Sequence, residues 1–343
     1  MANDTFLKAC RRETVDYTPV WLMRQAGRYL KEYMEIRKNH DFLEMCKTPE
    51  LACEVTLQPL RRFDLDAAII FADILLPLEG MGVNFGFAKN EGPYIEKPIR
   101  ERSQIDAIKI INPEQDVPYL LSALKMVKAE LNGKVPLIGF CGAPFTLASY
   151  MIEGGGSRNY IHTKKLIYSD PGAWKAFMEK ICDVLAVYLN AQIEAGAEAL
   201  QVFDSWVGCL GPGEYREFVL PYTRKVIESV GGKVPVINFS TNTGPYIDLV
   251  SEAGGDVVGV DWRIRLDTAW EKIGRDRAIQ GNLDPGVLFG PASAIRAKAK
   301  EILDMAGGRP GHIFNLGHGI ILGTPVDSVK ALVDSVHELS GAK

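Results

Sequence analysis

The sequence has no long hydrophobic run and no excess of positive charge. No apolar stretch approaches the ~20 residues that a membrane-spanning helix needs, and the first residues, MANDTFLKACRRE, lack the apolar core of a signal peptide. We therefore expect a cytoplasmic protein without membrane contact. A net charge of −4 and a pI of 5.8 argue against a nucleic-acid partner. An anionic small molecule remains a candidate ligand, because a local basic patch can oppose the overall sign.

Common metal, nucleotide and nucleophile motifs are also missing. None of the six cysteines is spaced as CxxC, so we interpret them as reduced thiols. There is no HExxH, no zinc-ligand spacing, no GxSxG and no P-loop. The run GMGVNFG is one residue too long for the dinucleotide fingerprint. His312 and His318 lie at opposite ends of one predicted strand and cannot share a metal. We expect no metal and no cofactor.

What the chain of 343 residues does contain is a series of short, continuous apolar runs separated by helical stretches. Continuous rather than alternating runs are typical of parallel strands covered on both faces. Regular strand–helix units favour a single (β/α)8 barrel over residues 1–343, with a doubly wound open sheet as the alternative. We expect extended loops at its C-terminal face: a hairpin within Gly80–Gly92 and a lid at 154–156. The eight predicted strands are Pro19–Met23, Ala67–Phe71, Leu137–Phe140, Ala199–Phe203, Val234–Phe239, Val257–Val260, Ala278–Gln280 and His312–Leu316.

Polar side chains follow these runs, at the barrel face where active sites are built. Each has an ordinary interpretation as well: a surface salt bridge for the arginines, a helix cap for Asp73 or Ser205, a core ring for Tyr150. His318 is the strongest single candidate, because its flanking glycines permit unusual backbone angles and close approach of a ligand. The residues at the strand ends are Arg24, Arg28, Asp73, Tyr150, Asp204, Ser205, Ser240, Asp261, Trp262, Arg263, Asn282, Asp284 and His318.

Arg24 and Arg28 belong to the most informative segment. The buried run before them delivers two guanidiniums on a glycine-containing turn, and such heads pair bidentately with carboxylates or phosphates. The segment also resembles the uroporphyrinogen decarboxylases, as do others that together span about residue 5 to residue 335. The matching segments are PVWLMRQAGRY, LRRFDLDAAIIFADIL, GFCGAPFTLASYMIEGGGS, QVFDSWVG and FNLGHGI.

The resemblance implies a (β/α)8 homodimer that removes carbon dioxide from the four acetate side chains of uroporphyrinogen III without metal or cofactor, giving coproporphyrinogen III. It implies that Asp73 accepts hydrogen bonds from the pyrrole N–H groups. Carried over by position, Asp73, Arg24, Arg28 and His318 would be catalytic. The substrate-binding set would be Arg24, Gln25, Ala26, Gly27, Arg28, Asp73, Tyr150, Ser205 and His318.

Two departures from the common pattern, Lys31 and the segment GIILGTP after His318, affect loop shape rather than these positions. Two other functions remain open. Corrinoid or coenzyme M methyltransferases resemble the decarboxylases but carry zinc on a His-x-Cys pair, whereas the fifth predicted strand here ends with Phe239 and Ser240 and no cysteine follows position 209. A non-catalytic tetrapyrrole carrier is the third reading, and an intact Asp73 argues against it.

Overall fold

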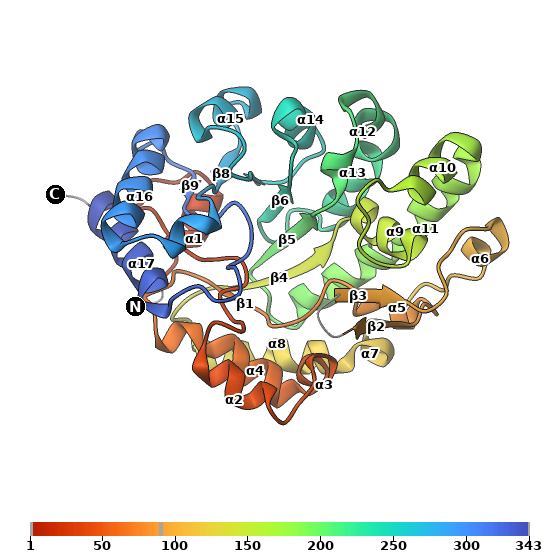
Figure 1. Cartoon of the computed structure of the whole chain (residues 1–343), viewed down its shortest axis with the longest axis horizontal. Helices are drawn as coiled ribbons and strands as arrows, with labels where there is room; N and C mark the ends of the chain where they lie inside the picture. The colour runs from red at the N-terminus through yellow and green to blue at the C-terminus, as the bar shows by residue number, and fades with distance from the viewer. Residues whose placement is uncertain (1–2, 89–91, 342–343) are drawn as a thin grey trace.

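A curved parallel sheet lies at the centre of the chain, surrounded by helices (Figure 1). The computed structural model describes residues 3–88 and 92–341, and in that part of the chain the sheet has seven strands in the order β1-β4-β5-β6-β7-β8-β9. All neighbouring pairs are parallel, for example Ile138 with Ala199 and Ile237 with Val257. The strands are β1 Ala68–Ile69, β4 Leu137–Gly142, β5 Ala199–Asp204, β6 Val236–Ser240, β7 Val257–Gly259, β8 Ala278–Gln280 and β9 His312–Ile313.

The first predicted strand, Pro19–Met23, is present as a single β-bridge rather than a strand. Val20 bridges Phe314 in the parallel sense, and the Phe314 N–H donates to the Pro19 carbonyl at 2.8 Å. On the other side, the Asp66 N–H donates to the Val20 carbonyl at 2.9 Å. The segment therefore lies between β9 and the chain leading into β1. The paired sheet has seven strands where eight were expected, and a closed barrel stays a prediction.

Helices alternate with the strands, as the spacing of the apolar runs predicts. Several begin with proline in the first turn, where its missing N–H costs nothing. The longest one follows the Asp170 cap, whose carboxylate accepts from the Ala173 N–H at 2.8 Å. The helices are α1 Thr5–Cys10, α2 Lys31–Arg37, α3 Phe42–Lys47, α4 Pro49–Leu57, α5 Pro77–Gly80, α6 Arg102–Asp106, α7 Pro113–Asp116, α8 Pro118–Leu131, α9 Pro144–Glu153, α10 Ile161–Ser169, α11 Pro171–Glu194, α12 Pro212–Phe218, α13 Leu220–Ser229, α14 Ile247–Glu252, α15 Leu266–Ile273, α16 Ala292–Ala306 and α17 Val326–Ser340, with 3-10 turns η1 Pro59–Arg61, η2 Val207–Cys209, η3 Gly244–Tyr246 and η4 Pro285–Phe289.

The buried apolar residues form two clusters, one on each face of the curved sheet. The larger packs the helices against its outer face. The smaller collects one or two residues from each strand or strand neighbour, together with α1, and its buried members are 0–2% exposed. A polar layer crosses this inner space: the Trp21 Nε1–H donates to Gln280 at 2.9 Å, and Gln280 donates to Gln201 on β5 at 3.0 Å. Because β5 and β8 are not neighbours, these bonds tie opposite parts of the curved sheet together.

The expected hairpin is present. Strands β2 (Phe85–Ala88) and β3 (Gly92–Ile95) pair antiparallel, and residues 89–91 between them lie outside the described residues. The glycines that were expected to form a lid are held by this hairpin, because Tyr94 bridges Gly155 and the Ile95 N–H donates to the Gly154 carbonyl at 2.9 Å. The first two residues of the expected lid, Gly154 and Gly155, are therefore bonded to strand β3 of the hairpin. No helix in the described ranges has the length and apolar character needed to cross a bilayer.

Candidate active site

Hydrogen bonds of Gln25 hold the loop that carries Arg24, and the Arg24 side chain is exposed. Arg24 itself adopts a left-handed backbone, φ 60°, which is costly for a residue with a Cβ and persists only where the surroundings enforce it. Gln25 supplies part of that enforcement: buried completely, it accepts from the Leu22 N–H at 3.1 Å and donates to the Ala67 carbonyl at 3.1 Å. Its backbone is bonded as well, since the N–H donates to the Leu22 carbonyl at 2.9 Å and the carbonyl accepts from the Tyr29 hydroxyl at 2.6 Å. Gln25 thus holds the turn, and its contact with a substrate stays a prediction.

The rest of the RQAGR turn lies at the rim. Ala26 and Gly27 are half-buried and Arg28 is exposed. The charge of Arg28 bears on Tyr33 of α2, where it opposes the burial that raises the pKa of the phenol. Arg28 therefore lies within reach of α2, and its contact with the substrate stays a prediction.

The His318 loop packs directly against Arg24. The Ile320 N–H donates to the Met23 carbonyl at 2.9 Å, which joins the two loops by their backbones. A Cβ on Gly319 would come within 2.4 Å of the Arg24 Cδ, and one on Gly317 would come within 2.5 Å of the Trp262 backbone nitrogen. The two glycines therefore let Arg24 and Trp262 approach this loop closely, but neither glycine has the left-handed backbone that the pattern allowed. Close approach of a ligand stays a prediction.

Asp73 follows β1 and lies half-buried at the strand ends. One carboxylate oxygen accepts from the Leu75 N–H at 2.9 Å. Burial raises the pKa of Asp73 to about 6, while the Leu75 N–H and the Arg24 guanidinium act in the opposite direction. The carboxylate is therefore mostly ionised at pH 7, but it is poorly solvated and would gain from further hydrogen-bond donors.

Tyr150 lies on α9 in the same cluster. Its ring packs edge-on against Trp206 with centroids 5.7 Å apart, and Trp206 also contacts Tyr160 from the segment after the three glycines. Burial raises the pKa of Tyr150 to about 12, and the charge of Asp73 adds to the shift while Arg24 opposes it. The phenol is protonated at neutral pH, which suits a hydrogen-bond donor, and its contact with the substrate stays a prediction.

Burial lowers the pKa of His318 to about 4; among the neighbouring charges, Arg24 lowers it, Asp261 raises it and Arg263 lowers it. The imidazole is neutral in the free protein at pH 7. It can donate one hydrogen bond and accept another, but it is not an acid with a proton to spare.

Asp73, Tyr150 and His318 therefore each lie within electrostatic reach of Arg24, and Asp73 also acts on Tyr150. Ser205 follows β5 and is half-buried; its carbonyl accepts from the Thr241 hydroxyl at 2.8 Å. Its hydroxyl has no recorded partner within residues 3–88 and 92–341, and its substrate contact remains a prediction.

Asp204, directly before Ser205, stands out only in the structure. It is 3% exposed, accepts from the Thr146 hydroxyl at 2.7 Å, and burial raises its pKa to about 7. The sequence places it at a strand end, but nothing in the sequence distinguishes a buried carboxylate from an exposed one there. The helix residue Thr146, which orients it, has no signal of its own.

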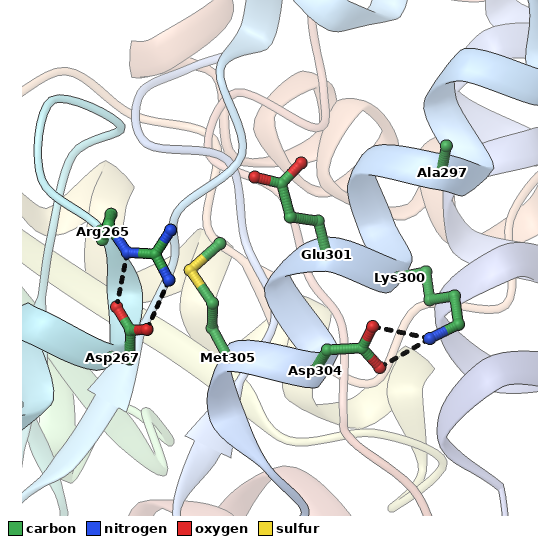
Figure 2. Close-up of a pocket in the computed structure, with 7 residues that line it drawn as sticks. All are labelled: Arg265, Asp267, Ala297, Lys300, Glu301, Asp304 and Met305. Carbon is green, nitrogen blue, oxygen red and sulfur yellow. Dashed lines mark hydrogen bonds and ion pairs between the residues drawn. The ribbon is translucent and has the colours of Figure 1, made fainter.

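Other hollows of the surface do not compete with this cluster. Figure 2 shows one of about 420 Å³ along α16, beside the start of α15. Four of its charged side chains are paired: Arg265 with Asp267 at 2.6 Å and Lys300 with Asp304 at 2.6 Å. Glu301 lines it as well, so carboxylates outnumber cations there and the hollow does not suit an anionic ligand. Within residues 3–88 and 92–341, no three His, Cys, Asp or Glu side chains are grouped so as to hold a metal ion.

Comparison with known proteins agrees with the resemblance. The family model described as "Uroporphyrinogen decarboxylase (URO-D)" matches residues 1–339. The uroporphyrinogen decarboxylase of Carboxydothermus hydrogenoformans is 61% identical, over 98% of this chain and 97% of that protein. The corresponding protein of Geobacter sulfurreducens is 50% identical, over 98% of this chain and 99% of its own length.

Among solved structures, a methyltransferase from Methanosarcina mazei superposes with a TM-score of 0.83 at 23% identity, covering 98% of this chain and 99% of the other. That likeness establishes a shared architecture and carries no information on chemistry. The sequence relatives, in contrast, match nearly the full length of both chains at high identity. This chain belongs to the uroporphyrinogen decarboxylase family.

Proposed function

We propose that the protein decarboxylates the four acetate side chains of uroporphyrinogen III to methyl groups, giving coproporphyrinogen III in haem biosynthesis. The observation that carries the proposal is Asp73, a poorly solvated carboxylate at the strand ends whose charge acts on Tyr150 and which, like His318, lies within reach of the Arg24 charge. In a family matched over nearly the whole chain, this arrangement suits a substrate with a ring of N–H donors at its centre and carboxylates at its edge.

Substrate binding follows from the charges. Arg24 and Arg28 are both exposed and take the acetate and propionate arms, since a guanidinium pairs bidentately with a carboxylate. Asp73 keeps one oxygen on the Leu75 N–H and offers the remaining acceptor capacity to the pyrrole N–H groups. Those donors favour the ionised carboxylate and so lower its pKa from about 6 in the free protein. Tyr150, Ser205 and His318 complete the contacts.

The reaction needs an electron sink, and the pyrrole ring supplies it. Protonation of the ring carbon next to the acetate-bearing position makes the ring cationic. The bond to the carboxylate carbon then breaks, carbon dioxide leaves, and its electron pair neutralises the ring while an exocyclic methylene forms. A second proton adds to the methylene to give the methyl group, and the first ring proton is lost. Each cycle consumes one proton and requires no redox partner.

Asp73 acts at the reaction steps in which the pyrrole ring is cationic. A fixed anion near the ring stabilises the charge that develops on protonation, and it does so more in the transition state than in the neutral substrate. The proton donor is a separate matter: a guanidinium is a poor free acid, and His318, with a pKa of about 4, is neutral in the free protein. A carboxylic acid arm of the substrate or a water held by Arg24 meets the requirement without either side chain losing a proton.

The finer features of the architecture belong to this proposal too. We infer that Pro19–Met23 closes the sheet into an eight-stranded barrel, because its backbone bonds to Phe314 on one side and to Asp66 on the other. The family resemblance supports a homodimer and a cytoplasmic setting. Of the alternative functions, the zinc methyltransferases are disfavoured by the end of β6, where Asn238 and Ser240 stand without a histidine or cysteine nearby on the strand.

Anaerobic incubation with uroporphyrinogen III in the presence of a metal chelator tests the function. We expect products with seven, six, five and finally four carboxylates, resolved by chromatography after oxidation to the porphyrins. Binding of uroporphyrinogen with no change in carboxylate number would indicate a carrier. Turnover that stops on chelation and returns with zinc would contradict the metal-free scheme.

A further inference from the structure

A third arginine is presented at the strand ends, and the family resemblance assigns it no role. Arg263 follows β7, and its side chain is 47% exposed although its neighbour Asp261 is only 2% exposed. Its charge helps lower the pKa of His318, so it lies within electrostatic reach of the site. Arg24 acts on the same imidazole. Two guanidiniums therefore act on His318, and the one of Arg263 is paired with Asp261.

The loop that carries Arg263 is rigid. Asp261 accepts from the backbone N–H of Asn242 at 2.7 Å and from that of Arg263 at 3.0 Å, while the Asn282 amide donates to the carbonyls of Asp261 at 2.8 Å and Ile264 at 2.7 Å. Bonds from the ends of β6 and β8 thus hold the loop on both sides. Trp262 packs against Gly317, which fixes this loop to the one that carries His318.

The guanidinium itself is pre-oriented and only partly used. One Nη donates to Asp261 at 2.7 Å, and the planar group stacks over the Trp262 ring with its carbon 4.0 Å from the centroid. Within the described ranges this is the one hydrogen bond recorded for a group with five N–H donors. A stacked, anchored guanidinium loses little side-chain entropy on pairing with an anion, which makes it a better anchor than a free surface arginine.

The position of Arg263 relative to Arg24 decides which part of a substrate Arg263 can bind. Along the sheet, β9 and then the Pro19–Met23 segment come after β8, so His318 lies between the loop after β7 and the loop of Arg24. Arg24 and Arg263 thus approach the site from different sides. A substrate with carboxylates around its whole edge needs cations on more than one side, whereas Arg24 and Arg28 share a single loop.

We propose that Arg263 is a substrate-binding residue that pairs with a side-chain carboxylate of the porphyrinogen on the other side of His318 from the RQAGR turn, residues 24–28. The proposal rests on the proposed function. The carboxylate is either a propionate, present in every intermediate, or an acetate, present only until its own decarboxylation. Because Arg263 contacts an arm and not the reacting ring, its loss weakens binding and leaves the chemical step unchanged.

The experiment compares Arg263→Gln with Arg265→Gln under steady-state turnover of uroporphyrinogen III. Arg265 is a matched control: it lies two residues along, is 65% exposed, and pairs with Asp267 in the hollow of Figure 2. We expect KM to rise about tenfold in Arg263→Gln, the loss of a half-exposed charge-assisted contact, with kcat within twofold of the wild type. Arg265→Gln keeps both parameters. The difference in KM shrinks at higher salt, because exposed charges are screened.

The outcomes separate the possibilities. An unchanged KM in folded Arg263→Gln overturns the proposal. A loss of kcat that is matched by a loss of thermal stability also overturns it, because it would indicate that Arg263 only neutralises Asp261. If that variant does not fold, Arg263→Lys decides: about a threefold rise in KM supports bidentate pairing and a wild-type KM refutes it. Repeating the assay with the pentacarboxylate intermediate distinguishes a propionate, for which the effect persists, from an acetate already lost. Absence of wild-type turnover would instead overturn the proposed function itself.

Discussion

Replacing Asp73 by Asn removes one charge and almost no volume. The Asn side-chain oxygen can still accept from the Leu75 N–H, which Asp73 now does at 2.9 Å. The local fold should therefore survive. What disappears is the anion next to the substrate ring. At ~4 Å and an effective dielectric of about 20, attraction between that anion and a cationic ring is of order 4 kcal/mol. Realised only in the transition state, this is roughly a thousandfold in kcat, since each ~1.4 kcal/mol is tenfold.

The same substitution should stabilise the fold at neutral pH. Burial raises the pKa of Asp73 to about 6 from 3.8, so the folded protein carries an ionised group that it solvates badly. A shift of about two units is at most about 3 kcal/mol, less for a half-exposed group. Because the folded pKa is the higher one, this penalty is full above pH 6 and fades as the pH falls from 6 to 4. The melting temperature of Asp73→Asn should exceed that of the wild type at pH 7 and equal it near pH 4.

The assay combines single-turnover decarboxylation of uroporphyrinogen III with thermal unfolding across pH 4–8. Lost activity together with gained stability identifies a residue kept for chemistry at a cost to the fold. Asp73→Glu keeps the charge and should retain part of the activity. Near-normal kcat in the Asn variant would refute the electrostatic role, and a drop in melting temperature at pH 7 would refute the stated environment of the carboxylate.

Three further changes test the rest of the site. Gly319→Ala places a Cβ 2.4 Å from the Arg24 Cδ and should raise KM severalfold by displacing that side chain, whereas Gly213→Ala, which meets nothing within 4 Å, should be silent in the same assay. His318→Gln should leave the limbs of the pH–rate profile above pH 5 in place, because the pKa of His318 is about 4 in the free protein; loss of one limb would identify it as the titrating acid. Tyr150→Phe should keep the fold and lower kcat/KM about tenfold through loss of one donor, and wild-type kinetics would show that only the ring matters.

The apolar runs located the strands well because their signal is local. A continuous run such as that of β5 is buried on both faces wherever the neighbouring strands lie, so its sequence alone identifies it. Pro19–Met23 has the same composition but forms only a bridge. Pairing depends on backbone register with β9 and with the chain before β1, and register is set by packing across the sheet rather than by residue type.

The site was predicted in part for the same reason. Arg24, Asp73 and His318 were found because strand ends collect at one face of a parallel sheet, which follows from topology. The inward turn of Gln25 and the depth of Asp204 could not be found that way, because both depend on which atoms lie nearby: the Ala67 carbonyl for one and the Thr146 hydroxyl for the other.

The sequence by itself determined the order of strands and helices, the family and the set of polar residues at the strand ends. These are properties of residue type and spacing along the chain. Only the tertiary structure decided the protonation states and the packing. His318 is neutral and Asp73 is poorly solvated because of burial and neighbouring guanidiniums contributed by loops far apart in sequence. The free energy of a charge depends on what surrounds it in space, and that information is absent from the order of residues.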